Sequence, residues 1–186
     1  MSVVLNNIFS RRSFRSYKEE PITEAELEAI IEAGKFAPSA MNQQPWHFTV
    51  IQNQAILHKI NDTLKNMFLK SNNPKMVERA SSEDFSPFYH APTLIIVSGD
   101  TKAVAPEADC SLALGNMFLA AESLDIGSCW INSLRSLGNT KEGAALIKEL
   151  DIPEDYIIFG SGAFGYKGTD HPEAPTRREG TVTYIE

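Results

Sequence analysis

A cluster of basic residues near the N-terminus is the first group whose side chains could do specific chemistry. Arg11, Arg12 and Arg15 lie within five residues of one another, together with the hydroxyl of Ser13. Guanidinium groups donate planar, charge-assisted hydrogen bonds and serine adds a neutral donor, so the cluster could hold a phosphate dianion. Arginine clusters are also common on solvated surfaces, so these residues alone leave both interpretations open.

A second polar group lies in the segment PSAMNQQPWH, residues 38–47, between a predicted helix and a predicted strand. Loops held by rigid elements often carry binding groups. Ser39, Asn42 and Gln44 can donate and accept hydrogen bonds, which suits a polar heterocycle or a polyol. The alternative is an ordinary capped turn.

Two further patterns are weaker. Arg177 and Arg178 follow two prolines near the C-terminus, and such a pair alone is typical of a solvated end. Residues 160–165 fit the spacing G-x-G-x-x-G, but no helix is predicted after them, so a dinucleotide-binding turn is not expected. These glycines are expected to allow close backbone packing.

The bulk properties narrow the class of protein. A chain of 186 residues with 42% hydrophobic residues predicts one globular domain over residues 1–186. The formal net charge of -7 argues against nucleic acid as the main partner. The sequence has neither a long apolar run nor a secretory pattern, so a cytoplasmic protein without membrane contact is expected. Cys110 and Cys129 are expected to be buried and reduced, and the histidine spacing predicts no metal site.

The hydrophobic pattern predicts an α+β fold, with one sheet between helices. The expected helices cover residues 2–10, 23–36, 54–69, 107–124 and 140–150. The expected strands cover 46–52, 92–100, 128–131 and a segment from 156 that runs into glycine-rich turns. Residues 71–91 read as a polar, mobile excursion.

Two segments suggest a second copy of the chain. Residues 107–124 are apolar nearly all round, so that helix must be buried on most sides, and a second copy would cover it. The terminal strand predicted at 181–185 has no nearby partner in sequence and is expected to pair with another subunit.

Taken in order, the motifs resemble those of the nitroreductase family, in its compact members. The resemblance rests on RRSFRSY, APSAMNQQPWHF, FYHAPTLIIV, DCSLALGNMFLAAESLDIGSCWI and the late arginine pair, and covers essentially the whole chain. It implies a central, mostly antiparallel sheet flanked by helices in an intertwined homodimer. One FMN would lie in each of two clefts at the dimer interface.

The resemblance also implies roles for particular residues. The FMN phosphate and ribityl end would be bound by Arg11, Arg12, Ser13 and Arg15. The other subunit would line the flavin with Ser39, Ala40, Met41, Asn42 and Gln44. The stretch passing flavin N5 would be Trp130, Ile131, Asn132 and Ser133, where many members have Glu-Gly in place of the last two. Arg177 or Arg178 would close the phosphate site.

The implied activity needs no catalytic side chain, because the flavin carries the chemistry. NAD(P)H would reduce the flavin, and a small acceptor such as a nitroaromatic or quinone would then be reduced in ping-pong fashion. Two alternatives stay open: an FMN-holding or redox-responsive protein without efficient NAD(P)H turnover, and a binding module for another phosphate ligand. Phe85, Phe88 and Tyr89 would form either a roof over a flat substrate or core and dimer contacts.

Overall fold

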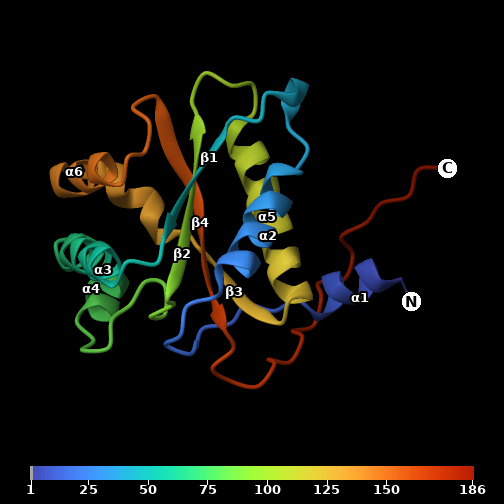
Figure 1. The fold of residues 1–186 in the computed structure, drawn as a ribbon, viewed down its shortest axis with the longest axis horizontal. Helices are drawn as coiled ribbons and strands as arrows, with labels where there is room; N and C mark the ends of the chain where they lie inside the picture. The colour runs from blue at the N-terminus through green and yellow to red at the C-terminus, as the bar shows by residue number, and fades with distance from the viewer. Residues whose placement is uncertain (1) are drawn as a thin grey trace.

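The computed structural model describes residues 2–186 and contains one antiparallel sheet. Its four strands lie in the order β1-β2-β4-β3 (Figure 1). They are β1 (Trp46–Ile51), β2 (Thr93–Asp100), β3 (Ile126–Ile131) and β4 (Tyr156–Tyr166). The expected α+β class and the antiparallel sheet are confirmed.

Helices cover both faces of this sheet (Figure 1). One face carries α2 (Glu24–Lys35) and α5 (Pro106–Ser123). The other carries α3 (Gln54–Leu69), α4 (Pro74–Ala80), the 3-10 helix η2 (Ser133–Asn139) and α6 (Lys141–Glu149). Because the sheet is covered on both faces, the middle of strand β2, residues 94–97, is apolar on both sides.

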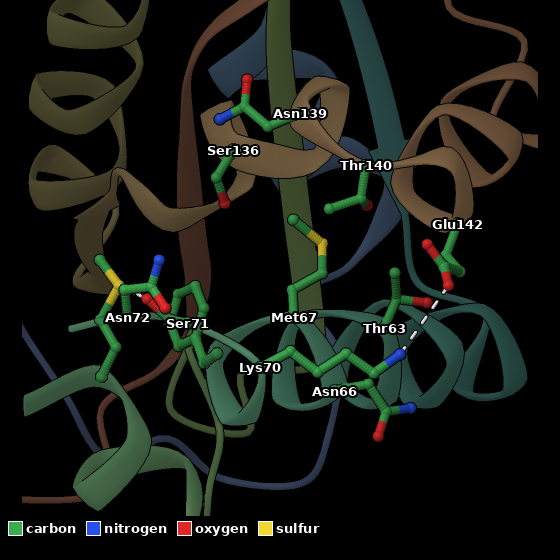
Figure 2. A pocket seen from close by; sticks show the side chains of 12 residues that line it. Thr63, Asn66, Met67, Lys70, Ser71, Asn72, Ser136, Asn139, Thr140 and Glu142 are labelled. Carbon is green, nitrogen blue, oxygen red and sulfur yellow. Dashed lines mark hydrogen bonds and ion pairs between the residues drawn. The ribbon is translucent and has the colours of Figure 1, made fainter. Parts of the chain in front are cut away.

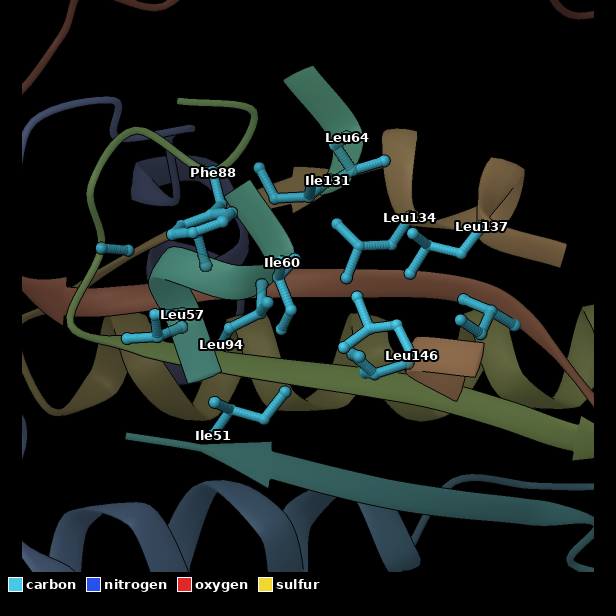
Figure 3. Packing of buried hydrophobic residues seen from close by; sticks show 14 of the residues in the cluster. Ile51, Leu57, Ile60, Leu64, Phe88, Leu94, Ile131, Leu134, Leu137 and Leu146 are labelled. Carbon is cyan, nitrogen blue, oxygen red and sulfur yellow. The ribbon is translucent and has the colours of Figure 1, made fainter. Parts of the chain in front are cut away.

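Strand β2 shows how one continuous apolar run serves two cores. Leu94 and Ile96 point into the cluster under α3 and α6, whereas Ile95 and Val97 point into the cluster under α2 and α5. All four are fully buried. Figure 3 shows the first cluster, with Ile60 of α3 beside Leu94 and with residues of η2 and α6 completing it. Successive side chains of a strand point to opposite faces, so the unbroken pattern is required here.

The predicted helix ends are largely correct, and local capping explains them. Thr23 accepts from the backbone N–H of Glu26, whose carboxylate accepts from Thr23 N–H at 2.8 Å, so α2 begins with a capping box. Asn53 caps α3 and Thr140 caps α6 in the simpler way.

Helix α5 is buried against the sheet and α2, but part of its apolar surface stays uncovered. Leu112 is 49% exposed and Leu124 39% exposed. Helix α1 (Val3–Ser10) lies beside α5, where Asn7 Nδ2 donates to the carbonyl of Leu119 at 2.8 Å. No residue of α1 is buried, although the helix is largely apolar.

Several sequence predictions were wrong in detail. Residues 71–91 include α4, which Asn73 caps and Pro74 begins, because proline suits the first helical position. The glycine-rich segment forms no turns, because β4 continues through it to Tyr166. Strand β3 begins at Ile126, earlier than predicted. Residues 181–185 form no strand in this single chain, so their pairing with another subunit stays a prediction. Within residues 2–186, no helix is both long and apolar enough to cross a membrane.

Candidate anion and cofactor site

The N-terminal basic segment runs alongside strand β3. Phe14 N–H donates to the carbonyl of Ser128 at 3.0 Å, and Ser13 bridges to Ser128 in parallel fashion. The Phe14 side chain is fully buried, and a side chain at Gly127 would come within 3.1 Å of it. Because extended residues alternate in direction, Ser13 and Arg15 point away from this buried anchor.

The segment that follows β4, from Lys167 onward, begins by packing against Phe14. Lys167 Nζ lies 5.0 Å from the centre of the Phe14 ring and 2.6 Å from a carboxylate oxygen of Asp125. The His171 ring meets the Phe14 ring edge-on, with 5.5 Å between their centres. His171 Nε2 lies 3.4 Å from the mostly buried carboxylate of Glu122. These contacts bring the residues after His171 next to the N-terminal arginines.

A cavity of about 320 Å³ lies where the two segments meet. It is lined by Arg11, Arg12, Ser13, Arg15, Pro172, Glu173, Pro175 and Arg177. We call this the arginine cavity. The structure thus brings the N-terminal cluster together with Arg177, while Arg178 is not among the lining residues.

The charges of the arginine cavity are unbalanced. Its lining holds four arginines and one acidic residue, Glu173. Within residues 2–186, none of these four arginines forms an ion pair. Like charges that line one cavity repel one another, and an anion between them offsets the repulsion. The cavity therefore suits a ligand with a negative group.

Arg12 has a structural task besides lining the cavity. Its Nη1 donates to the carbonyls of Phe9, Ser10 and Arg11 at 2.7, 3.0 and 2.8 Å. These carbonyls lie at the C-terminal end of α1, where helical carbonyls lack partners and a cation is favoured. Arg12 Nε is buried and has no hydrogen-bond partner among residues 2–186, so an anion in the cavity would be a suitable acceptor.

Arg15 lies over an aromatic ring, and its charge acts on a buried thiol. Its guanidinium carbon lies 5.8 Å from the centre of the Tyr89 ring. Cys129 is buried and reduced, as expected, and its burial raises the pKa of the thiol, with nearby Arg15 opposing the rise. This thiol is therefore a poor nucleophile at neutral pH.

The polar loop at residues 39–44 has a strained backbone. It contains the short 3-10 helix η1 (Ala40–Asn42). Met41, Asn42 and Gln44 have φ of 52°, 54° and 48°, in the left-handed region that non-glycine residues rarely occupy. The Asn42 and Gln44 side chains bond one another at 2.9 Å. The loop does not line the arginine cavity of its own chain.

The stretch from Trp130 to Ser133 joins β3 to η2. Ile131 is buried and its carbonyl accepts from Ser161 Oγ at 2.8 Å, which fixes the strand end. Asn132 follows it as an exposed residue. Trp130 is 37% exposed and packs over Gly160, where a side chain would come within 2.7 Å of the indole. The stretch lies outside the arginine cavity.

Sequence reasoning missed several residues of these sites. Pro172, Glu173 and Pro175 complete the arginine cavity, and the buried Asp109 hydrogen-bonds to the loop at Ala40. Phe85 and Phe88 belong to the core, so for them the core interpretation was correct, whereas Tyr89 is partly exposed. Only the prolines, which mark an irregular segment, gave any signal in sequence.

A larger cavity of about 890 Å³ lies between α3, α4, η2 and α6 (Figure 2). Its lining is mostly hydroxyl and amide side chains, and Lys70 faces Glu142 across it at 3.9 Å. It includes none of the residues predicted from the sequence as binding groups. In the described part of the chain, no group of three or more acidic, histidine or cysteine side chains is placed to hold a metal.

The chain is similar to several known proteins over most or all of its length. A nitroreductase from Bacteroides fragilis NCTC 9343, solved with bound FMN, is 41% identical, with a TM-score of 0.94 over 100% of both chains. A nitroreductase from Desulfitobacterium hafniense DCB-2, also solved with FMN, is 28% identical, with a TM-score of 0.89 over 100% of both chains. An NAD(P)H FMN reductase of Bacillus subtilis (strain 168) is 26% identical over 100% of this chain and 74% of its own length. The model of the nitroreductase family matches residues 8–166, so the chain belongs to that family.

Proposed function

We propose that this chain is an FMN-dependent oxidoreductase that takes its electrons from NAD(P)H. The observation that carries the proposal is the arginine cavity, whose four guanidinium groups lack an anionic partner within residues 2–186. A phosphate dianion fits this donor set, and arginine is well suited to it. The FMN bound by the related structures carries such a group.

The residues predicted from the sequence would divide the binding of the cofactor among them. Arg11, Ser13, Arg15 and Arg177 would bind the phosphate end, with Arg12 contributing its free Nε. The stretch from Trp130 to Ser133 would pass the ring, and the loop at residues 39–44 would reach it from a second copy of the chain. In this proposal each half-site is incomplete without the partner copy.

Exposed apolar residues support the homodimer. Along α1, Val3 is 84% and Phe9 56% exposed, and at the C-terminus Tyr184 and Ile185 are 84% and 96% exposed. Both segments lie beyond α5 and away from the sheet (Figure 1). Clustered apolar surface of this kind marks an interface, and a second copy would cover it.

Bound FMN would supply the redox chemistry, accepting a hydride from NAD(P)H and reducing a small acceptor such as a nitroaromatic or quinone. The protein would contribute binding, orientation and exclusion of water. Since one site would serve donor and acceptor in turn, ping-pong kinetics are expected. An intersecting initial-velocity pattern would contradict that order of events.

The test is a visible absorption spectrum of the purified protein, followed by anaerobic addition of NADPH and, separately, NADH. A flavin spectrum that bleaches rapidly would support the oxidoreductase. A flavin spectrum that stays unchanged with both donors would favour an FMN-holding or redox-responsive protein. A protein that takes up no FMN would overturn the cofactor assignment and favour a different phosphate ligand.

A further inference from the structure

The loop at residues 39–44 adopts a conformation that its own sequence does not favour. Met41, Asn42 and Gln44 are left-handed, and none of them is a glycine, the residue for which this region carries little penalty. Met41 is 85% exposed, so packing of its side chain does not offset the strain. Strain of this kind persists only where surrounding contacts over-determine the conformation.

Besides the bond between the Asn42 and Gln44 side chains, three side chains accept hydrogen bonds that hold the loop. Ser39 Oγ accepts from Gln44 N–H at 3.0 Å, within the loop itself. Gln43 Oε1 accepts from Val104 N–H at 2.9 Å, at an exposed position. Asp109 Oδ1 accepts from Ala40 N–H at 3.1 Å, and this is the contact made by a buried residue. A hydrogen bond shielded from water holds its partners more firmly than one exposed to water.

The burial of Asp109 is unfavourable for the stability of the fold. It is 3% exposed, and its second oxygen, Oδ2, has no hydrogen-bond partner within the described chain. Its place near the start of α5 offers partial compensation, because the helix dipole favours negative charge there. A buried carboxyl group with an unpaired oxygen is nonetheless costly, and such costs are concentrated at functional sites.

We infer that Asp109 is a positioning residue, which fixes the strained loop in the conformation that receives the flavin. The inference rests on the proposed function. Asp109 would touch neither the flavin nor its phosphate, and would act only through Ala40 and the residues after it. It therefore differs in kind from Arg11, which lines the arginine cavity directly.

The experiment compares Asp109→Ala and Asp109→Asn with the wild-type chain. Glu142→Gln is the control, since it removes a first-turn carboxylate from α6, which lies on the other face of the sheet from α5 (Figure 1). Each protein is stripped of flavin and titrated with FMN and with riboflavin, which lacks the phosphate. Hydrogen exchange of the Ala40 amide is measured on the same flavin-free proteins. Circular dichroism checks the fold of each.

For Asp109→Ala we expect the affinities for FMN and for riboflavin to fall by the same factor, at least tenfold. Hydrogen exchange of the Ala40 amide should be faster than in the wild type. Asp109→Asn retains an acceptor oxygen and should recover most of the affinity, and Glu142→Gln should match the wild type. Unchanged exchange at Ala40 in a folded Asp109→Ala, or loss confined to FMN, would overturn the inference. If Asp109→Ala does not fold, the test rests on Asp109→Asn. A folded Asp109→Asn that binds flavin weakly, yet exchanges the Ala40 amide as slowly as the wild type, would also overturn the inference. If the wild type binds neither flavin, the proposed function fails, while faster Ala40 exchange in Asp109→Ala still supports control of the loop by Asp109.

Discussion

The guanidinium carbon of Arg15 lies 5.8 Å from the centre of the Tyr89 ring, a cation–π distance across 74 residues of sequence. This contact joins the arginine cavity to the segment between α4 and β2. Tyr89 reaches it through a left-handed backbone with φ of 59°, followed by His90 with φ of 53°. Two consecutive strained residues indicate that the direction of Tyr89 is specified by the fold.

Replacing Tyr89 should therefore weaken anion binding in the arginine cavity without disrupting the hydrophobic core. Tyr89→Leu should lower FMN affinity several-fold, because a cation–π contact at a partly exposed site contributes about 0.5–1 kcal/mol. Tyr89→Phe keeps the ring and should retain most of that affinity. Fluorescence titration of the flavin-free variants measures both. Equal affinities for the Leu and Phe variants would mean that the ring does not help to place Arg15.

The two arginines near the C-terminus should behave differently. Arg177 lines the cavity, whereas Arg178 does not. Arg177→Ala should remove a charge-assisted bond of about 1.5–3 kcal/mol, or roughly ten- to 150-fold in FMN affinity. Arg178→Ala is the matched control and should bind FMN like the wild type. Riboflavin binding should be unaffected in both, and a loss in Arg178→Ala alone would reverse the assignment.

Arg12 should matter for stability as well as for binding. Arg12→Ala removes three hydrogen bonds to the end of α1, and we expect the free energy of unfolding to fall by about 1–3 kcal/mol. Urea denaturation of the flavin-free protein measures this change. Arg11→Ala, which lacks these contacts, should lose FMN affinity with a smaller change in stability. Equal destabilisation by both would argue against the capping role.

Cys110 predicts a dependence of stability on alkaline pH. Burial, with Asp109 adding to it, raises the pKa of the Cys110 thiol to about 12. A raised folded-state pKa means that the folded protein holds the proton longer, so this stabilisation is complete below about pH 8.5 and is lost as pH rises towards 12. In Cys110→Ser the free energy of unfolding should decline less steeply between pH 8 and about 10.5. Parallel pH profiles for the two proteins would refute the assignment.

Asp151 offers a test of backbone strain away from the site. It follows the end of α6 with φ of 52°, at an exposed position. Asp151→Gly should raise the free energy of unfolding by up to about 1 kcal/mol, because glycine carries little penalty in this region. Asp151→Ala keeps a Cβ and should not gain stability. Thermal unfolding of the two variants decides between them.

The sequence predicted those elements whose causes are local. The capping box of Thr23 and Glu26 marks the start of α2 without reference to any distant residue. The continuous apolar run of β2 predicts a strand covered on both faces, and its residues enter both cores. In the same way, the arginine cluster could be picked out because its members are neighbours in sequence.

The rest depended on long-range contacts or on conformations that sequence rules do not detect. Pro172 and Pro175 reach the cavity only because Lys167 and His171 pack on Phe14. The loop at residues 39–44 was predicted as a loop, but its left-handed angles at Met41 and Gln44 were not, because neither residue favours that region. Helix α4 was overlooked because its seven residues are too few to show an apolar period, and most of them are exposed.

The packing of the C-terminal segment beside Phe14 has a consequence for the protein without flavin. The wall of the arginine cavity that carries Arg177 is an irregular segment, and we expect repulsion between the guanidinium groups to push this wall outward when no anion is bound. A small dianion that enters the cavity would attract guanidinium groups from both segments. It would thereby hold the N-terminal and C-terminal segments next to each other. By mass action the melting temperature of the flavin-free protein should then depend on the buffer anion, rising from chloride to sulfate or phosphate at equal ionic strength.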